Sequence, residues 1–178
     1  MRTSLLTAAV IAALITTGCV NTVNQTQDSA QAATNDSPPA STVFAARLYP
    51  VEGLKTFDAP DNSVKVAFGG NTMFSHDGAS LSTEAQQQLI QVANALNNVA
   101  FSRVVVLGYT DSSGKLAHNN MLSQQRADQV RSFLIKQGIA TDRVSAQGRG
   151  PAEPIADNKT AQGRAANRRV ELTVVFES

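Results

Sequence analysis

The chain has 178 residues, enough for one domain of ordinary size together with additional segments. Its 15 Lys and Arg residues nearly balance its 14 Asp and Glu residues, so the charge pattern indicates no nucleic-acid partner. Cys19 is the only cysteine, which excludes an intramolecular disulfide. The chain has two histidines and no metal-spaced Cys/His cluster, and we expect neither a metal nor a cofactor.

Residues 1–18 have the features of an export signal. Arg2 gives a positive start, and Leu5–Ile15 is an apolar run too short to span a bilayer as a stable helix. Small and polar residues then lead into Cys19. This arrangement resembles a bacterial lipoprotein signal, which implies cleavage before Cys19 and a lipid on that cysteine.

The residues around Cys19 bear on how the leader is processed. Thr16 departs from the lipoprotein pattern, which favours Leu three places before the cysteine. The alternative is an ordinary signal peptide followed by a free cysteine. Because Val20 is not Asp, the resemblance to enteric lipoproteins implies attachment to the outer membrane, with the protein facing the periplasm.

Two segments separate the leader from the expected domain. Residues 19–42 consist, after Cys19, mainly of small and polar residues and Pro, a composition that cannot bury a core, and we predict a flexible tether. Residues 43–63 form a lead-in segment whose structure the sequence does not define. Its apolar residues can pack on the domain; they are Phe44, Leu48, Tyr49, Val51, Leu54 and Phe57.

Residues 64–178 carry alternating strand and helix signals. Apolar segments predict strands at 64–68, 103–108, 143–148 and 169–176. Helical periodicity predicts a helix over 83–98, which Ser82 or Thr83 can cap, and a second over 119–137, which Gly138 ends. The order β-α-β-α-β-β predicts an α/β two-layer sandwich with a mixed sheet and helices on one face.

One charged residue lies on the apolar stripe of the second predicted helix. Arg126 is four residues after Leu122 and four before Val130, and a buried guanidinium needs an anionic partner. Asp111, just beyond the strand 103–108, is the nearest candidate in the sequence. Either the two side chains pair with each other, or both face a cleft and hold a ligand with one ammonium and one carboxylate.

The motif Gly108-Tyr109-Thr110-Asp111-x-x-Gly114, followed by Asn119-x-x-Leu122-Ser123-x-x-Arg126-Ala127, resembles the core signature of OmpA-like peptidoglycan-binding domains. Further matches lie at Gly163-Arg164-x-x-Asn167-Arg168-Arg169, and the resemblance extends over residues 64–176. It implies the family fold, which agrees with the order of elements above. The family holds the diaminopimelate residue of the peptidoglycan stem peptide, whose side chain ends in an ammonium and a carboxylate. The resemblance therefore favours the cleft arrangement.

The same resemblance implies roles for individual residues. Asp111 should accept the ligand's ammonium, and Arg126 should grip its carboxylate with two parallel hydrogen bonds, which lysine cannot make. Further contacts are implied for Thr110, Asn119, Asp77, Asn167 and Arg168. For Asp77 the alternative is a turn residue beside Gly78. Among Arg164, Arg168 and Arg169, one or two are expected only to hold their loop.

No catalytic set accompanies these residues. The sequence has no nucleophile elbow, no P-loop and no paired carboxylates at the expected cleft, so we do not expect an enzyme. The leading hypothesis is a lipoprotein that anchors the outer membrane to the cell wall. One alternative is a wall-sensing regulator whose segment 43–63 contacts a periplasmic protein partner. Another is a stator-like or secretion-system anchor, although the sequence lacks the transmembrane helix that such stators carry.

Overall fold

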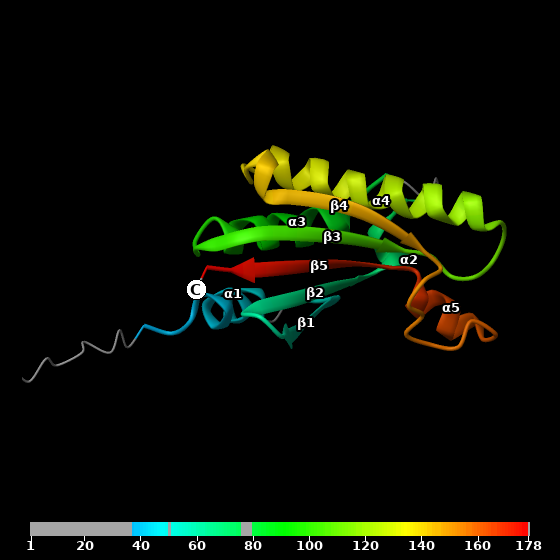
Figure 1. The fold of residues 1–178 in the computed structure, drawn as a ribbon, viewed down its shortest axis with the longest axis horizontal. Coiled ribbons are helices and arrows are strands. Elements are labelled where there is room, and N and C mark those ends of the chain that lie inside the picture. The colour runs from blue at the N-terminus through cyan, green and yellow to red at the C-terminus, as the bar shows by residue number, and fades with distance from the viewer. Residues whose placement is uncertain (1–36, 50, 76–79, 178) are drawn as a thin grey trace, which may run out of the picture. The chain divides into compact units, whose positions relative to one another are not determined.

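The computed structural model describes residues 37–49, 51–75 and 80–177, which form a five-stranded sheet and its helices (Figure 1). The strands are β1 (Leu54–Ala59), β2 (Ser63–Gly69), β3 (Phe101–Tyr109), β4 (Val144–Gly150) and β5 (Arg169–Phe176). The helices are α1 (Ala40–Leu48), α2 (Gly70–Met73), α3 (Thr83–Leu96), α4 (Leu116–Lys136) and α5 (Ala161–Asn167), and a 3₁₀ turn covers Thr141–Arg143. The predicted leader, Cys19 and Asp77 lie outside the described residues.

The strand order is β1-β2-β5-β3-β4. The pair β3–β4 is parallel and the other pairs are antiparallel, so the sheet is mixed. Helix α4 supplies the crossover that a parallel pair requires. Alternate residues of β5 are buried against the helices, namely Val170, Leu172, Val174 and Phe176. The predicted α/β fold class is confirmed.

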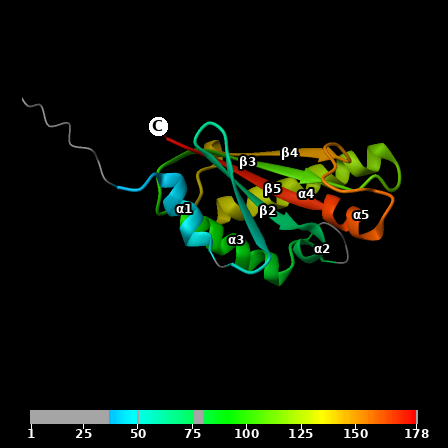
Figure 2. The ribbon, with the colours of Figure 1, turned by 90° about the horizontal axis from the view of Figure 1, so that it is seen from below.

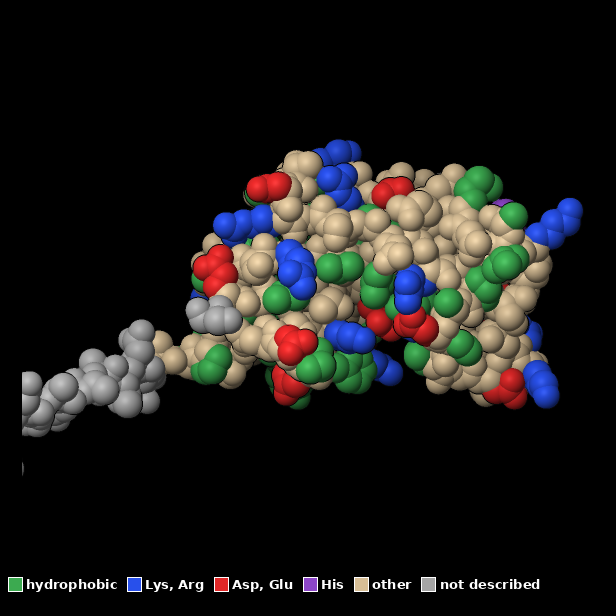
Figure 3. Space-filling view, in the orientation of Figure 1, with side chains coloured by type: hydrophobic (Ala, Val, Ile, Leu, Met, Phe, Trp, Pro, Cys, Tyr) green, Lys and Arg blue, Asp and Glu red, His purple; other side chains and the backbone are tan. Residues whose placement is uncertain are grey.

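Helices α1, α3 and α4 lie on one face of the sheet (Figures 1 and 2). Figure 3 views the opposite face, where Lys, Arg, Asp and Glu side chains are interspersed with apolar ones. The core therefore lies between the sheet and this helical layer. Within the described ranges, no helix combines the length and hydrophobicity needed to cross a membrane.

The segment 43–63 contributes two elements that the sequence did not define. Helix α1 begins at Ala40, inside the range predicted as tether, and buries Phe44 and Leu48. The Phe44 ring packs against Phe176 with centroids 5.5 Å apart. Strand β1 is an edge strand that pairs only with β2 and exposes its four central residues. It therefore has no apolar alternation from which a strand is predictable.

Helix α4 packs very closely on β3 and β4. A Cβ atom added to Gly108 would lie 2.3 Å from the Ser123 carbonyl oxygen, and one added to Gly148 would lie 2.4 Å from the Gln124 backbone nitrogen. Only glycine permits such an approach at these positions. The helix begins at Leu116, three residues before the predicted start at Asn119. The sequence did not indicate this start, because the N-cap residue, Lys115, makes no side-chain capping hydrogen bond.

Candidate ligand-binding site

The loop that follows β3 holds Asp111 in a fixed orientation. The Asp111 Oδ1 atom accepts a hydrogen bond from the Ser113 backbone N–H at 2.8 Å. The Asn119 side-chain amide, on α4, donates to the carbonyl oxygens of Asp111 at 3.2 Å and Ser113 at 2.9 Å. Asn119 thus fastens the loop to α4, a role that the resemblance did not indicate.

Asp111 forms an ion pair with Arg168 rather than with the partner expected from the helix periodicity. The Arg168 Nη1 atom lies 2.6 Å from Asp111 Oδ2. Burial raises the pKa of the Asp111 carboxyl, but hydrogen bonds from Arg168 and Ser113 outweigh burial and hold that pKa below its ordinary value. Asp111 is therefore ionised at neutral pH.

Arg126 is 8% exposed and lies beside the same pair. Its guanidinium carbon is 4.9 Å from the centroid of the Phe74 ring, which follows α2. Burial and the nearby Arg168 cation lower the pKa of Arg126, whereas Asp111 raises it. The electrostatic interactions among these three groups place Asp111, Arg126 and Arg168 in one cluster. An arginine remains charged under all ordinary conditions, so the cluster contains two cations.

A backbone contact with Gly70, the residue that follows the last residue of β2, positions Arg168. The Gly70 N–H donates to the Arg168 carbonyl oxygen at 2.7 Å. A Cβ atom at Gly70 would lie 2.4 Å from that oxygen, so the close contact requires glycine. This contact joins the start of α2 to the start of β5 and brings Phe74, Arg126 and Arg168 to the same end of the sheet.

Thr110 lies at the junction between β3 and this loop. Its backbone N–H donates to the Gly150 carbonyl oxygen at 2.8 Å. Its hydroxyl is buried and has no hydrogen-bond partner in the part of the chain that the structure describes. A buried polar group without a partner costs free energy, and such groups occur at functional sites.

Asn167 has no side-chain capacity left for a ligand. It is completely buried, its Oδ1 accepts from the backbone N–H groups of Ile155 and Ala156, and its Nδ2 donates to the Ala156 carbonyl and to Asn158 Oδ1. Asn158 Oδ1 also accepts from the Ser112 backbone N–H at 3.2 Å. The residues Asn167 and Asn158 therefore connect α5 to the loop that carries Asp111, a link that no sequence signal indicated.

The two arginines on either side of Arg168 hold structure in place. Arg164 donates to the carbonyl oxygens of Asn158 and Lys159, both at 3.0 Å. Arg169 donates to Glu171 at 2.6 Å and stacks on the Tyr109 ring with its guanidinium carbon 3.7 Å from the centroid. The expectation that some of the three arginines hold their loop agrees with these contacts, and Arg168 is the one directed at Asp111.

The described part of the site contains charged and amide groups. Among the described residues, no group of three or more His, Cys, Asp and Glu side chains is placed to hold a metal ion. The cluster offers one carboxylate for a cation and two guanidiniums for an anion. Its chemistry suits the recognition of a small group that carries both charges.

The sequence matches the family model described as the OmpA family over residues 73–168. This match covers more than half of the chain. The chain belongs to the OmpA family. The match runs from the last residue of α2 to Arg168, so Asp111, Arg126 and Arg168 all lie within it.

Two relatives illustrate this membership. The chain is 48% identical over 122 residues to the probable lipoprotein YiaD of Escherichia coli, covering 68% of this chain and 55% of YiaD. It is 30% identical over 139 residues to the outer-membrane lipoprotein YfiB of Pseudomonas aeruginosa, covering 78% of this chain and 83% of YfiB. The chain thus spans little more than half of YiaD and most of YfiB.

A solved structure resembles this chain in both fold and sequence. It is the cell wall anchor of the T6SS from Pseudomonas aeruginosa, with a TM-score of 0.67 and 36% identity. The alignment covers 79% of this chain and all of that one. The likeness therefore covers more of the chain than residues 73–168.

Proposed function

We propose that this protein binds peptidoglycan without cleaving it and holds the diaminopimelate residue of the stem peptide at the charged cluster. The observation that carries the proposal is the convergence of Asp111, Arg126 and Arg168 at one end of the sheet. The free end of the diaminopimelate side chain carries an ammonium and a carboxylate, which are complementary to the carboxylate and guanidiniums. The cell wall anchor named above supports a wall ligand.

In this proposal, each charged residue has a distinct task. Asp111 accepts the ligand's ammonium, because its low pKa keeps the carboxylate ionised. Arg126 grips the ligand's carboxylate, and the Phe74 ring beside its guanidinium restricts the orientation of the planar fork. Arg168 supports Asp111 and adds positive potential toward the same carboxylate.

We further propose that the protein is an envelope lipoprotein attached to the outer membrane through Cys19. The leader pattern and the relatives YiaD and YfiB, both named as lipoproteins, support this. Cys19→Ser should move the protein from the detergent phase to the aqueous phase in detergent partitioning. Wild-type protein that incorporates no labelled fatty acid would contradict the anchor.

Co-sedimentation with purified cell walls tests the binding site. Asp111→Ala and Arg126→Ala should each lower wall affinity about tenfold or more, because each removes charge-assisted hydrogen bonds to the ligand. Thermal unfolding of the same variants establishes that each one is folded at the temperature of the binding assay. Variants that bind walls normally, or wild-type protein that releases soluble wall fragments, would contradict the proposal.

A further inference from the structure

The exposed face of α3 carries amides where a solvated helix usually carries charges. Glu84 is the only charged residue among the 14 residues of the helix. Polar side chains recur at intervals of three and four residues, which places them on one face. They are Glu84, Gln87, Gln88, Gln91, Asn94 and Asn98, the last just beyond the end of the helix.

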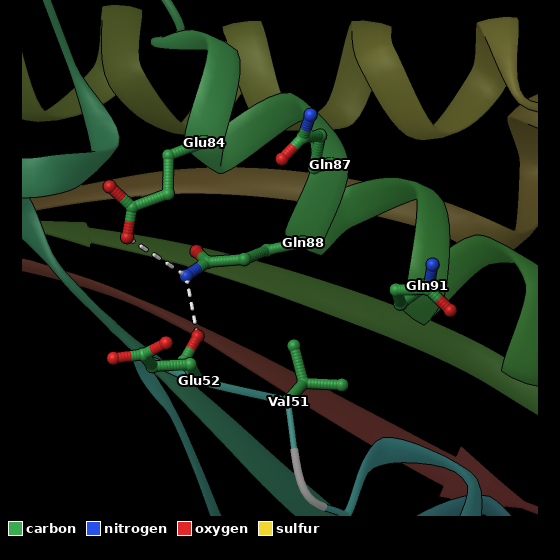
Figure 4. A pocket seen from close by; sticks show the side chains of 6 residues that line it. All are labelled: Val51, Glu52, Glu84, Gln87, Gln88 and Gln91. Atoms are coloured by element: carbon green, nitrogen blue, oxygen red, sulfur yellow. Dashed lines mark hydrogen bonds between the residues drawn. The ribbon is translucent and has the colours of Figure 1, made fainter.

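The stripe residues Glu84, Gln87, Gln88 and Gln91 form one wall of a cavity of about 540 Å³, and Val51 and Glu52 form the other (Figure 4). Gln88 is 7% exposed, and its Nε2 donates to the Glu52 carbonyl oxygen at 2.8 Å. Gly53 makes this approach possible: its φ is +80°, and a Cβ atom there would lie 2.6 Å from Gln88 Nε2. The spacing between the two walls is therefore built into the fold.

Two further hollows share lining residues with the cavity. One of about 320 Å³ shares Val51 and Glu52 and adds Tyr49. The other, of about 140 Å³, shares Gln91 and adds Arg47, Asn94 and Asn98. We call the cavity and these two hollows the groove. The cavity and the hollow that shares Gln91 lie along α3, whose 14 residues span about 21 Å. Such a length suits a segment of a polymer better than a single small metabolite.

The chemistry of the groove favours a neutral ligand rich in hydroxyl and amide groups. The amides of Gln87 and Gln91 are exposed and form no hydrogen bond within the described part of the chain, so they can both donate and accept. The carboxylates of Glu52 and Glu84 also line the groove and disfavour anions there. Arg47 lines only the 140 Å³ hollow, so two carboxylates face one guanidinium along the groove and an anionic polymer is a poor candidate.

Tyr49 adds an aromatic surface at the end of the groove. It is 84% exposed, which is a large apolar exposure for a ring in a folded domain. A tyrosine ring offers a rigid apolar face with a polar tip, and the C–H face of a sugar ring packs on such a surface. An exposed ring, planar amides and carboxylates are groups that can pack on and hydrogen-bond to a saccharide.

We propose that this groove binds the N-acetylated glycan strand of the cell wall. The inference rests on the proposed function and extends it, because the stem peptide at Asp111 and the glycan along α3 are different parts of one polymer. Tyr49 packs on a sugar ring, and Gln87 and Gln91 bond to hydroxyl and acetamido groups. Glu52 and Glu84 accept hydrogen bonds from sugar hydroxyls.

Nuclear magnetic resonance titrations of the full chain separate the two sites. A tetramer of N-acetylglucosamine should shift the side-chain amide signals of Gln87 and Gln91 and the backbone signal of Tyr49. A free diaminopimelate-containing stem peptide should instead shift signals of the loop after β3. If the sugar shifts the groove signals but the peptide shifts no signal, the proposed function alone is overturned. If the peptide shifts the loop signals but the sugar shifts no signal, the groove proposal alone is overturned.

Variants confirm which groups take part. Tyr49→Ala and Gln91→Ala should each weaken sugar binding about tenfold while leaving stem-peptide binding unchanged. Gln129→Ala, which removes an exposed glutamine from α4, is the matched control and should leave sugar binding as in the wild type. Circular dichroism establishes that each variant is folded. Absence of groove shifts with the sugar, or shifts there only with a trilysine peptide, would overturn the proposal, the second in favour of a basic protein partner.

Discussion

The Arg168 guanidinium lies 2.6 Å from the Asp111 carboxylate, the group that we expect to take the ligand's ammonium. Asp111 uses one oxygen for Arg168 and the other for the Ser113 N–H. A carboxylate has about four lone-pair sites, so an ammonium can bind without displacing either donor. The ion pair therefore holds the carboxylate charged and oriented before the ligand arrives.

A double-mutant cycle tests the ion pair directly. Asp111→Asn and Arg168→Ala should together destabilise the protein by about 1 kcal/mol less than the sum of the single changes, because either one removes the same pair. Urea unfolding of the four proteins gives the four free energies. Additive effects would show that the pair contributes nothing to stability.

The pH dependence of stability follows from the lowered pKa of Asp111. Its native pKa is below the ordinary value of 3.8, so the unfolded chain takes up the proton first as the pH falls. The stabilisation is therefore complete above that value and is lost as the pH falls through the native pKa.

The difference in free energy of unfolding between wild type and Asp111→Asn should stay constant from about pH 8 to pH 5 and decrease below about pH 4. Urea unfolding at each pH measures it. A difference that persists undiminished at about pH 2.5 would contradict the assignment.

The fold could be predicted from sequence where apolar periodicity was strong. Strand β5 alternates buried and partly exposed residues, and the Ser82 hydroxyl accepts from the Ala85 N–H as a predicted helix cap. Strand β1 could not be predicted, because an exposed edge strand has no buried alternation. Periodicity thus reports burial, and elements with little burial escape it.

The candidate site likewise has one feature that periodicity predicted and one that it did not. Helix periodicity placed Arg126 on the buried stripe, and the structure buries it. The pairing of Asp111 with Arg168 could not be predicted from spacing, because 57 residues separate them. The antiparallel pairing of β3 with β5, which sets Gly108 opposite Val170, brings the two residues together. The close contact between Gly70 and the Arg168 carbonyl could not be predicted either, because it joins backbone atoms of residues far apart in the sequence.

Asn167→Ala should destabilise the protein by about 1–3 kcal/mol, because the Ile155 and Ala156 N–H groups would lose their acceptor. The loop that carries Asp111 should also loosen, through Asn158 and Ser112. Thermal unfolding measures the first effect. Asn97→Ala, at an exposed position with one long hydrogen bond, is the control and should stay within about 0.5 kcal/mol of wild type. Equal effects of the two changes would contradict the anchoring role.

Gly148→Ala should destabilise the protein by about 1–3 kcal/mol, because its Cβ would meet the backbone of α4 at Gln124. Gly69→Ala is the matched control, since its Cβ would find no atom closer than the Thr72 hydroxyl at 3.9 Å. That change should cost less than about 1 kcal/mol. Chemical denaturation compares the two, and similar stabilities would show that α4 can move away from the sheet.

The central claim is that Arg126 and Asp111 hold the two charges of the diaminopimelate side chain. The most direct test compares two stem peptides that differ only at this residue, one with diaminopimelate and one with lysine, which lacks the side-chain carboxylate. Calorimetric titration of the full chain should give a preference of about tenfold or more for the diaminopimelate peptide, and Arg126→Lys should reduce that preference. Equal affinity of the wild-type protein for the two peptides would contradict the account.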